Sequence, residues 1–153
     1  IILTAPVNVS AQMTNSTDFN SQIIYLENGD YLETKIQSEQ TKLPLSEISL
    51  FTRSTKQITK TKTSTYKSAS GKSMWSVSIT GTFTYNGSSA KCVSCSHSSK
   101  TYTTNWTIKS ISSSKKDNSA TVNAVVVHTY NNTCKTNINK NVTITCSKNG
   151  TIS

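Results

Sequence analysis

Hydrophobic and polar residues alternate along much of the chain, and the alternation is clearest in residues 75–85, WSVSITGTFTY. Period-2 alternation over eleven residues is typical of an antiparallel strand with one face in the core. Asn86-Gly87 follows directly, and Asn-Gly favours a two-residue hairpin because both turn positions need positive φ. The pattern therefore predicts a long strand and a tight turn. The residues expected on the core face are Trp75, Val77, Ile79, Phe83 and Tyr85.

A two-residue turn at Asn86-Gly87 would also set the register of the returning strand, with Gly81 opposite Cys92. Gly81 is the one gap in the apolar stripe, and its missing side chain would leave room for a disulfide. We therefore expect Cys92 on the core face.

The same alternation predicts further strands on both sides of this hairpin. Asn28-Gly29 predicts a second hairpin upstream, and residues 115–118, KKDN, predict a polar turn downstream. Seven or eight short strands with turns every 8–14 residues favour an antiparallel, immunoglobulin-like β-sandwich. The further predicted strands are residues 23–27, 30–37, 55–67, 102–112, 120–130 and 136–146.

The composition narrows the class of protein. The chain has 153 residues, enough for one ordinary domain, and only 33% of them are hydrophobic. This share excludes a membrane span, a coiled coil and a large apolar core.

Residues 1–11, IILTAPVNVSA, resemble the tail of a signal peptide because an apolar stretch leads to small residues; the alternative is an ordinary strand. We assign residues 12–153 to a single domain.

Four cysteines fit a disulfide-stabilised domain in an oxidising compartment. Cys92 and Cys146 fall on core-facing positions of predicted strands, so we pair them and assign Cys95 to Cys134 by elimination. A Cys92–Cys146 bridge would contribute about 4 kcal/mol in the chain-entropy account. The CxxC formed by Cys92 and Cys95 has two alternative interpretations, a redox pair or half of a zinc site. It follows a strand rather than opening a helix, and no second CxxC is present.

Charge is distributed unevenly, with a formal net charge of +9. Residues 1–50 hold six acids and two bases, whereas residues 51–153 hold 14 bases and one acid, Asp117. This asymmetry favours an anionic partner, although the acidic N-terminal hairpin could instead lie on the basic body. Alternate lysines in residues 55–67 could form a cationic ridge or guard an edge strand against aggregation. The lysines assigned to anion binding are Lys56, Lys60, Lys62, Lys109, Lys115 and Lys116.

Motifs of catalysis are missing from the sequence, which has no GxSxG, HExxH or Gly-rich phosphate loop. His97 lies in a Ser-rich segment predicted as a loop, and His128 is expected at the margin of the core. We therefore expect no enzyme, no cofactor and no metal. The tryptophans and tyrosines lie on core parity rather than among the lysines, which argues against nucleic-acid binding.

Two segments resemble a group of small secreted β-sandwich proteins of clostridia and related Firmicutes. Residues 75–92, WSVSITGTFTYNGSSAKC, match their strand W-S-V-x-[VI]-x-G-x-F-x-Y-[ND]-G-x-[ST]-A-x-C. Residues 143–153, TITCSKNGTIS, match their C-terminal T-x-[TS]-C-S-x-[ND]-G, and residues 27–33, ENGDYLE, are similar to their upstream hairpin. The resemblance implies a secreted β-sandwich, supports the Cys92–Cys146 pair and implies no activity.

These features together favour a secreted, non-enzymatic, monomeric binding protein at or near a Gram-positive cell surface. Its partner would be an anionic polymer such as a teichoic acid or an acidic polysaccharide. We expect no membrane span in the protein and no specific nucleic acid as its partner. The alternative is a secreted antibacterial or toxin-like protein, because a cationic β-sandwich would suit attack on a membrane. The sequence lacks the long amphipathic hairpin that pore formation needs.

Overall fold

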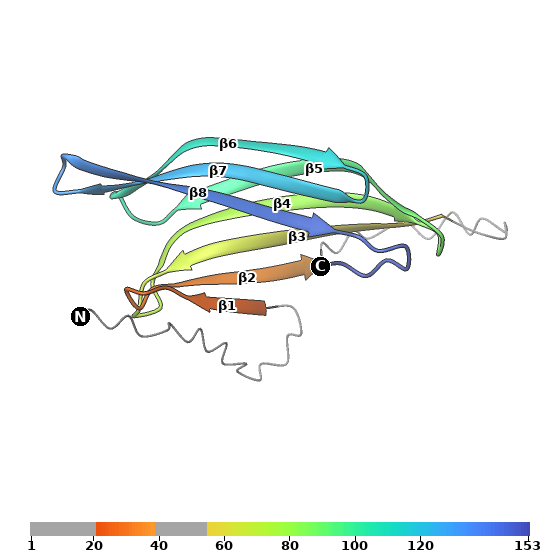
Figure 1. Cartoon of the computed structure of the whole chain (residues 1–153), viewed down its shortest axis with the longest axis horizontal. Helices are drawn as coiled ribbons and strands as arrows, with labels where there is room; N and C mark the ends of the chain where they lie inside the picture. The colour runs from red at the N-terminus through yellow and green to blue at the C-terminus, as the bar shows by residue number, and fades with distance from the viewer. Residues whose placement is uncertain (1–20, 39–54) are drawn as a thin grey trace, which may run out of the picture.

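Eight strands in two antiparallel sheets make up the described part of the chain, residues 21–38 and 55–153 of a computed structural model (Figure 1). This confirms the predicted all-β class. The predicted signal-peptide segment lies outside the described residues. Within them, no helix is long and apolar enough to cross a bilayer. The strands are β1 Ser21–Tyr25, β2 Tyr31–Ser38, β3 Lys56–Lys67, β4 Ser73–Tyr85, β5 Ala90–Thr101, β6 Trp106–Lys116, β7 Ser119–Tyr130 and β8 Cys134–Thr145.

Both sheets are meanders, because their strand orders are β1-β2-β3-β4-β5 and β6-β7-β8. The immunoglobulin fold requires Greek-key connections between its sheets, so an immunoglobulin-like topology is not confirmed. Figure 1 shows β6, β7 and β8 as a second layer over the five-stranded sheet. Within the described residues the backbone of this layer comes close to β3, β4 and β5, and not to β1 or β2. β1 and β2 therefore lie toward the edge of the sandwich, where Leu32 of β2 still packs against the core.

The core lies between the two layers and is centred on β4. Trp75, Val77, Ile79 and Phe83 are fully buried on its inner face, as the alternation predicts. The outer face carries hydroxyls that bond across the strands, for example between Thr63 of β3 and Ser78 at 2.7 Å. The second layer contributes the buried side chains of Trp106, Ala120, Val122, Ala124, Val126, Val142 and Ile144.

Two segments differ from their predicted structure. The Ser-rich segment after Cys92, predicted as a loop, continues as β5 to Thr101. His97 therefore lies on a strand, where its Nδ1 is 2.7 Å from the Ser113 Oγ of β6. The strand predicted at residues 102–112 begins later, at Trp106.

The turn between β4 and β5 is longer than the predicted two-residue hairpin. Tyr85 pairs with Ala90, so four residues connect the strands. The Asn86 Oδ1 accepts hydrogen bonds from the amides of Ser88 and Ser89, each at 2.9 Å. Asn side chains commonly close turns by bonding to backbone amides a few residues ahead, and here this bonding stabilises the longer turn.

A β-bulge in β5 changes which side chains face the core. Phe83 pairs with Cys92 and Gly81 pairs with Cys95, so two steps on β4 oppose three on β5. The extra residue, Val93, is exposed. A bulge of this kind reverses the parity of the following residues. The predicted pairing of Gly81 with Cys92 is therefore wrong, and Cys95 packs against the core rather than pointing away from it.

Candidate functional site

The lysines of β3 share one face, as predicted, but that face is the inner one. β3 pairs with β2 on one side and β4 on the other, so it is a central strand and not the predicted edge strand. Lys60 and Lys62 alternate in register with the buried Ser64 and Tyr66. They therefore point toward the second layer and form no outward ridge.

The other three lysines assigned to anion binding lie elsewhere. Lys109 occupies a β-bulge of β6 and is exposed beside Lys135 in a shallow pocket on the second sheet. Lys115 and Lys116 are exposed at the end of β6, next to the β6–β7 turn. The six predicted lysines thus occupy three separate places and do not form one cluster.

Most of the positive charge has no carboxylate partner within the described residues. These residues include 14 lysines and four acids. Ion pairs among them form only at Glu33, which lies 2.7 Å from the Lys67 Nζ and 3.2 Å from the Lys35 Nζ. Asp30 instead accepts a hydrogen bond from the Tyr66 hydroxyl at 2.7 Å. The acidic hairpin β1–β2 therefore neutralises one lysine of the basic segment rather than its whole surface.

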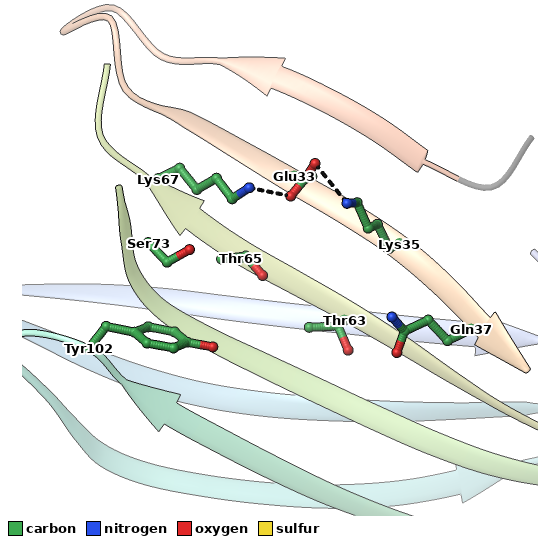
Figure 2. Close-up of a pocket in the computed structure, with 8 residues that line it drawn as sticks. All are labelled: Glu33, Lys35, Gln37, Thr63, Thr65, Lys67, Ser73 and Tyr102. Carbon is green, nitrogen blue, oxygen red and sulfur yellow. Dashed lines mark ion pairs between the residues drawn. The ribbon is translucent and has the colours of Figure 1, made fainter. Parts of the chain in front are cut away.

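A shallow pocket on the outer face of the five-stranded sheet contains this ion-pair network (Figure 2). It has a volume of about 220 Å³. Figure 2 shows Lys67, Glu33 and Lys35 along one side and the Tyr102 ring at one end. The remaining lining is polar and comes from Gln37, Thr63, Thr65 and Ser73.

The chemistry of this pocket suits a hydroxylated ligand. Tyr102 is 45% exposed, and the Lys100 Nζ lies 5.0 Å from the centre of its ring. An exposed ring can stack on the apolar face of a sugar, while hydroxyl and amide groups can bond to its oxygens. Burial alone raises the pKa of Glu33, but hydrogen bonds from Lys67 and Lys35 outweigh it and lower the pKa. The carboxylate therefore stays charged and holds both lysines.

The sequence did not point to this pocket, because its residues come from segments far apart in the chain. Glu33 and Lys67 are brought together by the pairing of β2 with β3. Tyr102 follows β5, which the sequence did not predict to extend so far. The one feature of the sequence that indicated this pocket was the polar face produced by the alternation in residues 55–67.

Cys92, Cys95 and Cys146 carry free thiols in the structure. Cys92 and Cys146 are buried in the core cluster at 2% and 0% exposure. Burial raises the pKa of both thiols, and the charges of Cys95 and Cys146 raise the pKa of Cys92 further. No group of three His, Cys, Asp or Glu residues within the described part of the chain is arranged to hold a metal ion.

The register argues against the second predicted bridge, Cys95–Cys134. Cys134 begins β8, whereas Cys146 directly follows its other end. Twelve steps along a strand span roughly 40 Å. Cys95 lies three residues from Cys92 and is therefore near the end of β8 that Cys146 follows. Cys134 begins the opposite end of β8, too far away for a disulfide, which needs Cα atoms within about 7 Å.

Aromatic rings form a ladder from the core to the end of the molecule opposite the β4–β5 turn. The His128 ring is stacked on Trp106, with centroids 4.0 Å apart and planes at 3°. Its Nε2 lies 3.1 Å from the Asn105 Nδ2. His128 is partly buried, at the margin of the core as predicted, and burial lowers its pKa. The ladder continues to Tyr130, which is 48% exposed.

Comparisons of the chain with protein-family models, curated proteins and solved structures found no match.

Proposed function

We propose that the protein is a secreted, non-enzymatic binding protein whose partner is an anionic, hydroxylated polymer such as a teichoic acid or an acidic polysaccharide. The observation that carries the proposal is the uncompensated positive charge. Twelve of the 14 described lysines have no carboxylate of the described residues at ion-pair distance. Exposed charges of one sign attract a polymer of the opposite sign, and the attraction weakens as salt shortens the Debye length.

The outer face of the five-stranded sheet is the favoured contact surface. It presents ladders of Ser and Thr hydroxyls, the exposed Tyr102 ring and the pocket beside Glu33. Lys35, Lys91 and Lys100 lie on this same face, opposite Thr63, Thr84 and Ser76 in the registers. Hydroxyls and a ring supply contacts to sugars, and these lysines supply the charge. Secretion would also allow the buried Cys92 and Cys146 to form a stabilising disulfide.

Three triple variants that remove the same charge would test the proposal on purified Gram-positive cell walls. One replaces Lys35, Lys91 and Lys100 by Gln, the second Lys56, Lys60 and Lys62, and the third Lys109, Lys115 and Lys116. The measurement is the salt concentration at which each protein elutes. We expect wild type to bind at low salt and elute as salt rises, with the first triple variant eluting earliest. Failure of wild type to bind at low salt would contradict the proposed function.

Equal elution of the three variants would instead show that net charge acts without a defined surface. An antibacterial or membrane-attacking protein would behave differently, because inserted protein stays with anionic lipid vesicles at high salt. The same salt series on vesicles therefore separates this alternative from polymer binding.

A further inference from the structure

Two lysines from different layers lie on the inner faces of contacting strands, and the charge of Lys62 acts on Lys140. Lys62 lies on the inner face of β3, where its cross-strand partners are the buried Ile79 of β4 and the partly buried Ile36 of β2. Lys140 lies on the inner face of β8, two positions from the partly buried Ile138 and from the buried Val142. β3 and β8 contact each other across the layers, and Figure 1 shows β8 in the layer that covers the five-stranded sheet.

The surroundings of both ammonium groups are unfavourable to positive charge. Both side chains are partly buried. Burial lowers the pKa of Lys62, and burial together with the charge of Lys62 lowers the pKa of Lys140. No carboxylate of residues 21–38 or 55–153 forms an ion pair with either of them. Two like charges held near each other in a partly desolvated place call for an anion between them.

Within the described residues, this place lies at the edge of the second layer. β8 is the last strand of the second layer, and its backbone comes close to β3 and β4 but not to β2. The inner face of β2 places Ile36 beside Lys62 at this edge. Among the described residues, the two partly buried lysines therefore lie at this edge rather than in the middle of the core.

We propose that Lys62 and Lys140 form a binding site for a tetrahedral oxyanion of the phosphate type. One oxyanion placed between them replaces a like-charge repulsion by two charge-assisted hydrogen bonds. Lysine serves as a point-charge ligand for phosphate. The site lies on the opposite face of β3 from the pocket that contains Glu33, so the inference does not depend on the proposed polymer binding.

The test is the thermal unfolding of the full chain in inorganic phosphate, with chloride at the same ionic strength as the reference. Phosphate at ten times its dissociation constant should raise the folding equilibrium constant about elevenfold, which appears as a higher Tm. Lys62→Met and Lys140→Met keep the length of the side chain and remove the charge. Each should fold at least as stably as wild type in chloride and should lose the effect of phosphate.

Lys109→Met is the matched control, because it removes the same charge from an exposed position on the second sheet. It should keep the full phosphate effect.

Dimethyl phosphate, tested in parallel, distinguishes the two sources of the ligand. Stabilisation by both compounds supports a diester within a polymer, and stabilisation by inorganic phosphate alone supports a free or terminal phosphate. No difference between phosphate and chloride in wild type would overturn the inference, as would an undiminished effect in Lys62→Met.

Discussion

Cys92 and Cys146 are held by the same turn. Their backbone amides donate hydrogen bonds to consecutive carbonyl oxygens of the β6–β7 turn, over 2.7 and 3.0 Å respectively. The acceptors are Asp117 and Asn118, and the Asn118 Nδ2 donates in return to the Cys146 carbonyl at 2.7 Å. A turn of the three-stranded sheet thus brings together residues that are far apart in the sequence. The two thiols are buried in the same core cluster.

We predict that the protein forms a Cys92–Cys146 disulfide in an oxidising compartment. The reason is their shared anchoring to one turn and their common place in the core. The bridge should stabilise the fold by about 4 kcal/mol, because it closes a loop of about 54 residues in the unfolded chain. Peptide mapping without reductant identifies the bridge, and denaturant unfolding with and without reductant measures its effect. A Cys92–Cys95 or Cys95–Cys146 linkage in the oxidised protein would show that the pairing is wrong.

Gly81→Val should destabilise the fold by about 1–3 kcal/mol through overpacking. A Cβ at this position would lie 2.6 Å from two ring carbons of Phe83 and 3.3 Å from the Ile144 Cγ2. The clash is therefore with a core ring. The predicted register had instead implied a clash with a disulfide.

Denaturant midpoints of Gly81→Val, Phe83→Leu and the double variant test this packing. Because Leu vacates the space of the ring, the double variant should lose less stability than the sum of the two single changes. Strict additivity would mean that Gly81 does not contact Phe83.

The sequence predicted the strands well because most of them carry a clear period-2 pattern. The core-facing residues of β4 follow from alternation alone. The register of β5 could not be predicted, because it depends on the Asn86 side chain closing a four-residue turn and on a bulge at Val93. Neither feature leaves a periodic signal in the sequence. Together they turn the Cys95 side chain toward the core.

The lysines of β3 show why the proposed binding surface was harder to predict than the fold. Alternation correctly places Lys60 and Lys62 on one face, but it does not say which face is inward. That depends on β2 and β4 flanking the strand, which is a long-range property. Lys140 did carry a local signal, since it interrupts the apolar stripe of Ile138, Val142 and Ile144.

The stability of the fold should fall as the pH drops below about 6.5, the ordinary histidine pKa, partly because of His128. Burial lowers the pKa of His128 in the folded state, so below that pH the unfolded chain binds more protons. The contribution of His128 to the stability of the fold is complete above pH 6.5. It decreases as the pH falls from 6.5 to the folded-state pKa of the imidazole.

Proton NMR of a His97→Gln variant would follow the imidazole of His128 alone. His128→Phe keeps a ring against Trp106, and its free energy of unfolding should depend less on pH between 8 and 5 than that of wild type. An imidazole that titrates above 6.5 would contradict this prediction.

Glu33→Gln should strengthen binding to anionic polymers. Its carboxylate holds Lys67 at 2.7 Å and Lys35 at 3.2 Å, and the amide would release both ammonium groups on the favoured contact face. The loss of stability should be about 1 kcal/mol, because the Lys35 side chain is half exposed whereas those of Lys67 and Glu33 are partly buried. Glu27→Gln is the matched control, since it changes the net charge equally and Glu27 is exposed without an ion pair among the described residues. On purified cell walls, Glu33→Gln should elute at higher salt than Glu27→Gln. If the two variants elute together, the outer pocket is not the contact surface and only the net charge of the protein matters.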